Sequence, residues 1–185
     1  MASLKGSQTE KNLLAAFAGE SQARNRYTIA AKVAKKEGYE QISGIFLETA
    51  ENELEHAKVF FKQLEGGEAE ITAGYPAGVF GDTLVHLKAA AAGEKLEWTT
   101  LYANFGDVAA QEGFREAARV FAQIGEVEKS HERRYNKLIE RVQAQSVFKR
   151  PEKMAWKCRN CGRVVEGTEP PNICPTCEHP QAYFE

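Results

Sequence analysis

The chain lacks long hydrophobic runs, an excess of charge of one sign, and cysteines outside one short segment. No stretch of its 185 residues approaches the ~18 apolar residues of a membrane-spanning helix, and its N-terminal residues have no apolar core of a signal peptide. A formal net charge of −2 gives no basic field that would attract nucleic acid. We therefore expect neither a membrane nor nucleic acid as a partner, and a cytoplasmic location.

Cysteine is confined to the C-terminal part of the chain, where all four residues form two Cys-x-x-Cys pairs. In a reducing compartment, such pairs indicate metal or redox chemistry before structural disulfides. Each pair can form a knuckle, and two knuckles place four sulfurs tetrahedrally around one ion. The expected ligands are Cys158, Cys161, Cys174 and Cys177. Their spacing fits structural zinc and a single iron ion about equally.

Apolar residues recur at helical spacing in four stretches, at 9–36, 40–65, 83–111 and 114–143. The segment 66–81 between the second and third stretches contains five glycines and a proline, so it predicts a connection rather than a helix. It is long enough to run the length of a bundle. The pattern therefore predicts a four-helix bundle of the ferritin-like type with a long crossover.

The composition changes after Ser146. Residues 148–155 are typical of a linker, and residues 156–185 are rich in Cys, Pro and Gly without helical periodicity. A segment of about thirty residues cannot bury a self-sufficient core, so it needs a bound metal to fold alone. We predict a bundle over residues 1–147, a linker over 148–155, and a small four-cysteine metal module over 156–185.

A glutamate followed three residues later by a histidine occurs twice, at Glu53–His56 and Glu128–His131. Residues three apart share one helix face, so each pair can hold one ion. Glu20 and Glu94 precede the two motifs, each within an Ala-Gly-Glu triplet, and Glu97 follows one turn after Glu94. One such motif on a charged helix is common. Two copies in register, each preceded by a glutamate, predict a site for two metals.

These acids follow the apolar stripes of their helices, so we expect them to point into the bundle. Buried carboxylates without partners are costly, and their convergence implies bound cations. Carboxylates with two imidazoles favour iron or manganese. Glu97 is either a further ligand or a rim residue in a salt bridge. Gly19 and Gly93, which weaken helices, lead to the hypothesis that a neighbouring helix approaches closely there.

On these residues the chain resembles a rubrerythrin, and the resemblance covers nearly its whole length. It rests on the segment from Phe17 to Tyr27, on the glutamate and histidine motifs, and on the two cysteine knuckles. The resemblance implies a ferritin-like bundle with two iron ions, and a rubredoxin-like domain with one iron in its four-cysteine site, where zinc is the alternative. It implies a peroxidase that reduces hydrogen peroxide to water and protects against oxidative stress.

The resemblance also implies a role for each residue of the di-iron site. The implied iron ligands are Glu53 and Glu128 as bridges, Glu20 and Glu97 on one iron, and Glu94 and His131 on the other. His56 would exchange with Glu97 as the redox state changes. Tyr27 and Tyr102 would donate hydrogen bonds to ligand carboxylates, and core aromatic packing is their other interpretation.

Electrons would come from an external reductase, because no Gly-rich dinucleotide fingerprint is present. The resemblance implies a homodimer or larger homo-oligomer in which one subunit's cysteine site serves another's di-iron centre. Arg163 and Glu178 depart from the common pattern around the cysteines, which leaves the potential of that site open. Two other functions compete: a ferritin-like protein that oxidises or stores iron, and a zinc-ribbon interaction protein whose bundle metals are incidental.

Overall fold

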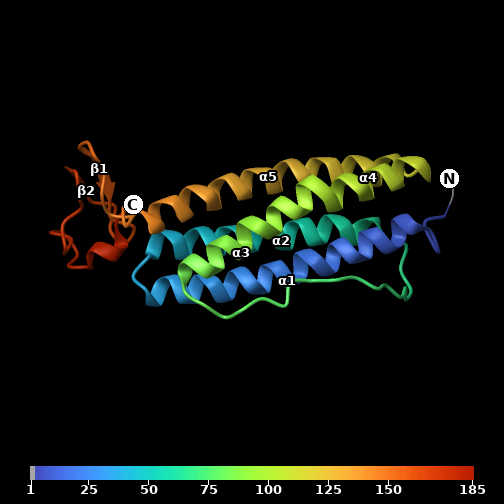
Figure 1. Ribbon diagram of the computed structural model, residues 1–185, viewed down its shortest axis with the longest axis horizontal. Coiled ribbons are helices and arrows are strands. Elements are labelled where there is room, and N and C mark those ends of the chain that lie inside the picture. The colour runs from blue at the N-terminus through green and yellow to red at the C-terminus, as the bar shows by residue number, and fades with distance from the viewer. Residues whose placement is uncertain (1–2) are drawn as a thin grey trace.

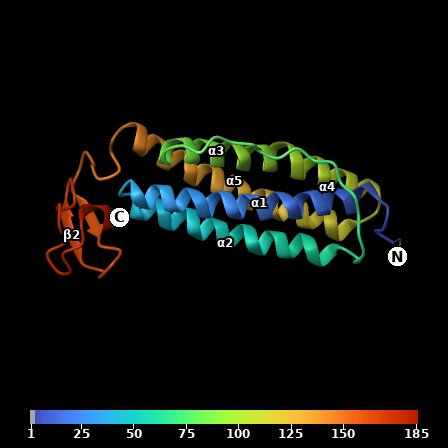
Figure 2. The ribbon, with the colours of Figure 1, turned by 90° about the horizontal axis from the view of Figure 1, so that it is seen from below.

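Four parallel and antiparallel helical rods form the bundle, and a small module with two strands sits at one end of it (Figures 1 and 2). The computed structural model describes residues 3–185, so the first two residues of the expected bundle domain lie outside the described part. Three rods are each a single helix: α1 (Gln8–Lys36), α2 (Glu40–Gln63) and α5 (Arg115–Gln143). The predicted fold class is confirmed. Within residues 3–185, no helix is long and apolar enough to cross a membrane.

The third rod differs from the sequence prediction in one place. It consists of α3 (Thr83–Leu96), the π-helical turn η1 (Glu97–Leu101) and α4 (Tyr102–Gln111). In the π turn, the backbone N–H of Tyr102 donates to the carbonyl of Glu97, five residues back. An unbroken α-helix had been expected here. A π turn inserts one extra residue into the helix, and the apolar pattern of the sequence does not reveal so small a change. Such turns are frequent at functional sites.

The connection between α2 and α3 runs back along the outside of the bundle, beside α1 (Figures 1 and 2). It returns the chain to the end where α2 began, so α2 and α3 point in the same direction. The predicted long crossover is therefore present. Tyr75 fastens it to the bundle, because its Oη donates to the backbone carbonyl of Ala15 at 2.8 Å.

Glutamates from distant parts of the chain cap two helix starts. The carboxylate of Glu112 accepts from the backbone N–H of Gln8 at 3.1 Å and of Thr9 at 2.8 Å, at the start of α1. The carboxylate of Glu37 accepts from the backbone N–H of Thr83 at 3.0 Å, at the start of α3. The first N–H groups of a helix have no partner within it, so these side chains join one helix end to the next.

The apolar core divides into two clusters along the bundle. One contains Ala23, Ala50, Ala91 and Tyr135, with their neighbours further toward the module. The other contains Ala16, Phe60, Tyr102 and Ile124, with their neighbours further toward the N-terminus of α1. In every rod, one of the predicted ligand glutamates falls between the two clusters. The fold therefore places these acids in one buried layer with apolar packing on either side.

The C-terminal module pairs β1 (Met154–Lys157) with β2 (Val164–Gly167) in an antiparallel ladder. Trp156 is buried in its small core, and its Nε1 donates to the Gly167 carbonyl at 3.0 Å. The module abuts the turn between α1 and α2, where a Cβ at Gly38 would lie 3.8 Å from Ala182 Cβ. Phe148, in the linker, stacks on Tyr39 of the same turn. β1 begins at Met154, inside the segment that the sequence predicts to be a linker. The domain boundaries at 147 and 155 stay a prediction.

Candidate metal centres

Six side chains from the four rods form two overlapping groups of possible metal donors in the buried layer of acids between the two apolar clusters, called the polar layer below. Within each group, one donor atom per residue lies within 4.8 Å of every other. The first group is Glu20, Glu53, His56 and Glu128, and the second is Glu53, Glu94, Glu128 and His131. Because Glu53 and Glu128 belong to both, two ions can bind side by side with two glutamates between them.

The four glutamates of these groups are almost fully removed from solvent. Glu53 is 1% exposed, and the others are 0% exposed. Within residues 3–185, Glu20 Oε2 and Glu94 Oε2 are buried without a hydrogen-bond partner. A buried, unpaired carboxylate oxygen costs several kcal/mol. One such atom on each outer glutamate, with the two shared glutamates between them, fits a pair of cations that would bind those oxygens.

Two buried tyrosines hold the outer glutamates. Tyr27 Oη donates to Glu94 Oε1 at 2.6 Å, and Tyr102 Oη donates to Glu20 Oε1 at 2.5 Å. Burial raises the pKa of both phenols well above 10, and the neighbouring glutamate charges raise it further. Both tyrosines therefore keep their protons and act as donors. Each outer glutamate has one oxygen held by a tyrosine and one free to bind a metal.

The two histidines lie directly against the shared glutamates. His56 Nδ1 is 2.9 Å from both Glu53 Oε2 and Glu128 Oε1, and His131 Nδ1 is 2.8 Å from Glu128 Oε2. Burial alone would lower the pKa of each imidazole. The hydrogen bonds to Glu128 and Glu53 outweigh it, and raise the pKa of His56 to about 9 and that of His131 to about 12. Metal ions would replace these protons, since an imidazole binds metal in its neutral form.

The pKa values of the carboxyl groups in this layer are shifted in opposite directions. Burial raises the pKa of Glu20 well above 4.5, and the charges of Glu53 and Glu128 add to that. Burial would also raise the pKa of Glu53, but hydrogen bonds from His131 and His56 outweigh it and lower its pKa to about 2. The layer thus holds four carboxyl groups against two imidazoles, a set of donors that divalent cations would ionise and bind.

Glu97 is the one predicted ligand of the bundle that belongs to neither group. It starts the π turn and is 9% exposed. The buried side-chain oxygens without a hydrogen-bond partner among residues 3–185 do not include those of Glu97. Glu97 also lines a cavity beside the layer of buried acids. His56, rather than Glu97, lies with Glu20 in the first group. The role of Glu97 as an iron ligand stays a prediction.

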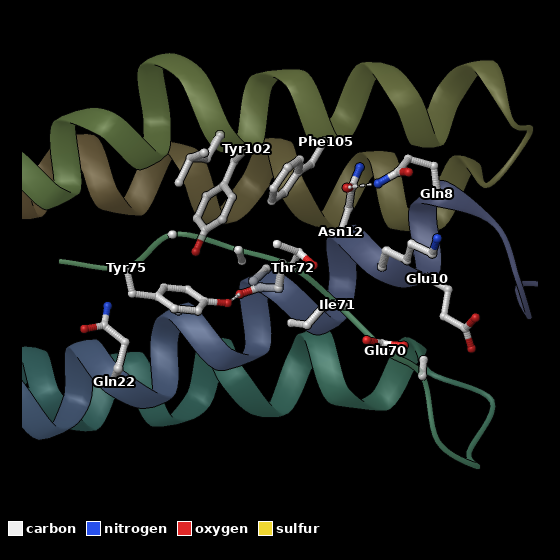
Figure 3. A pocket seen from close by; sticks show the side chains of 18 of the residues that line it. Gln8, Glu10, Asn12, Gln22, Glu70, Ile71, Thr72, Tyr75, Tyr102 and Phe105 are labelled. Carbon is white, nitrogen blue, oxygen red and sulfur yellow. Dashed lines mark hydrogen bonds between the residues drawn. The ribbon is translucent and has the colours of Figure 1, made fainter. Parts of the chain in front are cut away.

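This cavity, of about 1170 Å³, lies between α1, the crossover and the third rod (Figure 3). Tyr75 and Tyr102 point into it from opposite sides. Gly19 and Gly93 also line it. A Cβ at Gly19 would lie 3.7 Å from the Tyr75 ring, and one at Gly93 would lie 3.7 Å from the Arg26 guanidinium. The hypothesis of a closely approaching helix is therefore wrong, because side chains occupy that space.

The sequence reasoning missed the lining of this cavity. Gln22 and Arg26 both line it, and their spacing of four residues on one helix is the signal that could have paired them. Tyr75 gave no such signal, because its position depends on how the crossover lies on the bundle. The part of the chain that was expected only to connect two helices thus forms a wall beside the metal centre.

The four cysteines meet in the C-terminal module, and all are free thiols. Cys158 Sγ lies 3.7 Å from Cys177 Sγ, and Cys161 Sγ lies 3.7 Å from Cys174 Sγ. A tetrahedron with metal–sulfur bonds of about 2.3 Å has sulfur–sulfur edges of about 3.8 Å. The sulfurs are therefore already spaced for one tetrahedral ion.

The second cysteine of each knuckle is followed by a residue in the left-handed backbone region. Gly162 has φ +77°, and Glu178 has φ +59°. Only glycine adopts this region without strain, so the departure of Glu178 from the family pattern has a physical cost. Next to it, the backbone N–H of His179 lowers the pKa of the Cys177 thiol to about 6. A lower pKa favours the thiolate, which is the form that binds metal.

Comparison with known proteins agrees with this pair of sites. The family model for rubrerythrin matches residues 11–139 of the chain. The chain belongs to the rubrerythrin family. A second model, for the rubredoxin-like domain of rubrerythrin, matches residues 156–185. Members of the rubrerythrin family are oxidoreductases. This chain carries the donor sets of a di-iron site and of a rubredoxin-like iron site.

Named relatives and solved structures cover nearly the whole chain. The rubrerythrin of Porphyromonas gingivalis is 62% identical over 99% of this chain and 92% of its own. That of Nitratidesulfovibrio vulgaris is 54% identical over 100% of this chain and 97% of its own. The structure of fully reduced, all-ferrous nigerythrin has a TM-score of 0.64 at 30% identity, over 99% of this chain and 91% of that one. Reduced symerythrin from Cyanophora paradoxa, at 19% identity and a TM-score of 0.66, shares the bundle fold.

Proposed function

We propose that this rubrerythrin reduces hydrogen peroxide to water at its di-iron centre, with electrons supplied through the four-cysteine iron site, and so protects the cell against oxidative stress. The observation that carries the proposal is that one chain holds both a layer for two metals that share two glutamates and a separate four-thiolate site. An iron-storage protein needs only the first site. A zinc ribbon needs only the second.

The reaction consumes two electrons and two protons for each hydrogen peroxide and yields two waters. When bound, a pair of ferrous ions supplies both electrons, one from each ion. Carboxylates with two imidazoles suit iron. The chain's own contribution is to hold these ligands: Tyr27 and Tyr102 fix one oxygen of Glu94 and of Glu20. The apolar clusters on either side exclude bulk water from the layer.

Glu97 and His56 have the proposed role of alternating ligands of one iron. Two observations support it: His56 lies within the donor group of Glu20, and Glu97 lies next to that group on the cavity side. A side chain at the start of a π turn also has a backbone that departs from the regular helix, which suits a residue that must take two positions. The cavity offers peroxide a way to the same edge of the centre.

The proposed source of electrons lies outside the subunit's own centre. Arg159, next to Cys158, lies against Gly44 of α2. Glu53 is nine residues further along that helix, which is roughly 14 Å at 1.5 Å per residue. As the family resemblance implies, we place the electron transfer between subunits of a homodimer or larger homo-oligomer, with an external reductase protein as the donor. The clustered free thiols favour a reducing location such as the cytoplasm.

Rapid mixing of the diferrous protein with hydrogen peroxide or with oxygen tests the proposal. The centre should be reoxidised much faster by peroxide, with two electrons consumed per peroxide. A Cys174→Ser variant is the matched control, because it leaves the bundle intact. It should keep the first reoxidation and lose repeated turnover with a reductase. Equal or slower reaction with peroxide than with oxygen would contradict the proposal.

A further inference from the structure

Arg26 provides a fixed positive charge in the wall of the cavity. Its Nε donates to Gln22 Oε1 at 2.7 Å, and its guanidinium lies 5.6 Å from the centroid of the Tyr27 ring. The guanidinium also lies beside Gly93, where a Cβ would be 3.7 Å from it. A hydrogen bond, an aromatic face and a helix backbone therefore position this group. Neither the metal-site geometry nor the proposed reaction has so far given it a role.

Glu97 lies four residues, about one helical turn, after Gly93. It lines the same cavity as Arg26. The charges of Glu128 and Glu53 raise its pKa in addition to burial, and the charge of Arg26 acts in the opposite direction. Within residues 3–185, no ion pair within 4.0 Å joins the two side chains. The charges of the shared glutamates and of Arg26 therefore act on the Glu97 carboxylate in opposite directions without direct contact to Arg26.

A carboxylate in this setting needs a cationic partner, because burial without one is costly. The site offers two such partners: a metal ion in the first donor group, and the guanidinium of Arg26 in the wall of the same cavity. Arginine stays charged at any working pH and binds carboxylates through two parallel hydrogen bonds.

We propose that Arg26 is a positioning residue that attracts Glu97 toward the cavity side of the centre and competes with the metal ion for its carboxylate. Gln22 holds the guanidinium through its hydrogen bond, and Gly93 leaves the space in which the guanidinium lies. The inference rests on the proposed function only in that the bundle binds two divalent ions. It does not require that the protein turns over peroxide.

The test is a Co²⁺ titration of the full chain whose four-cysteine site has first been filled with zinc. Arg26→Gln removes the competing charge, so Co²⁺ should bind about fivefold more tightly to the first bundle site, which is the effect of a partly exposed ion pair. Arg26→Lys keeps the charge and should restore most of the original affinity. In a Glu97→Gln background, Arg26→Gln should change the affinity by less than about twofold, because the coupled partner is gone.

An equal gain in Co²⁺ affinity in both backgrounds would overturn the proposal, since Arg26 would then act on the ions directly through its charge. No gain in either background would overturn it as well. Gln22→Met is the second variant if Arg26→Gln does not fold. It frees the guanidinium without removing its charge, and should tighten Co²⁺ binding to a smaller extent only while Glu97 is present. Crystals of the Co²⁺-loaded Arg26→Gln protein should show the Glu97 carboxylate on the metal.

Discussion

The hydroxyl of Tyr102 should contribute directly to metal affinity. It donates to Glu20 Oε1 at 2.5 Å, and Glu20 Oε2 has no partner among residues 3–185. Tyr102→Phe keeps the ring packed between Phe60 and Phe121, at centroid distances of 5.4 and 5.9 Å. Only the hydrogen bond is lost. Its loss leaves both oxygens of Glu20 dependent on the metal.

The size of the effect follows from the charge of Glu20 in the two states. Burial and the neighbouring charges raise its pKa well above 4.5, which shifts the metal-free site toward the neutral form of this carboxyl. With a cation bound, it is ionised. A hydrogen bond to an ionised carboxylate is about twice as strong as one to a neutral group, and a neutral one is worth about 1 kcal/mol. The difference of about 1 kcal/mol corresponds to roughly fivefold weaker metal binding.

Competition titration with Co²⁺ measures this difference, and Tyr135→Phe is the matched control. Tyr135 is also buried in the bundle at 1% exposure, but its Oη has no hydrogen-bond partner in the described chain. Removing that hydroxyl should leave the affinity unchanged and the free energy of unfolding equal or higher. The reasoning is refuted if the two variants weaken Co²⁺ binding equally, or if Tyr102→Phe has no effect.

Three further predictions concern stability and the cavity. Glu178→Gly should raise the free energy of unfolding of the metal-loaded module by about 1 kcal/mol, because φ +59° is strained for any residue with a Cβ; thermal melts followed by the colour of the iron site check this. Glu112→Ala should destabilise the bundle by about 1 kcal/mol in urea titrations, since Thr9 loses its cap. Because the Thr9 hydroxyl lowers the pKa of Glu112 below 4.5, that contribution is present above this pH and is lost as pH falls through the lowered pKa; a gap between wild type and variant that does not shrink as the pH is lowered below 4.5 would contradict it. Gly19→Leu should displace the Tyr75 ring and change the rate of reoxidation by peroxide, with metal content unchanged, whereas Gly19→Ala should be tolerated.

The sequence was sufficient to predict the bundle, the crossover and the six donors of the polar layer. Helical periodicity places residues on a face, and a Glu-x-x-His motif puts two donors on that face wherever the helix lies. The two cysteine knuckles are equally local. The fold class is confirmed, and the predicted donors lie together in the structure, because each motif depends on spacing within one element and packing the four helices is enough to bring them together. Their role as metal ligands stays a prediction.

Features that depend on contacts between distant segments could not be predicted in the same way. The π turn at Glu97 adds one residue to a helix without altering its neighbours in sequence. The cavity exists because the crossover lies against α1, with Tyr75 bonded to Ala15. The left-handed backbone at Glu178 follows from closing the second knuckle around the metal. Each of these features depends on how separate segments of the chain contact one another.

The π turn also accounts for the inequality of the two halves of the bundle. Glu20 in α1 and Glu94 in α3 occupy matching places, each after an Ala-Gly pair. Three residues later, α1 continues unbroken and has Ala23, which is 1% exposed in an apolar cluster. The third rod has Glu97 at that place, where the π turn begins and the cavity wall lies. A spare carboxylate, a departure from regular helix and an opening toward solvent therefore coincide on one side of the metal layer, and it is on this side that we expect the chemistry with peroxide to begin.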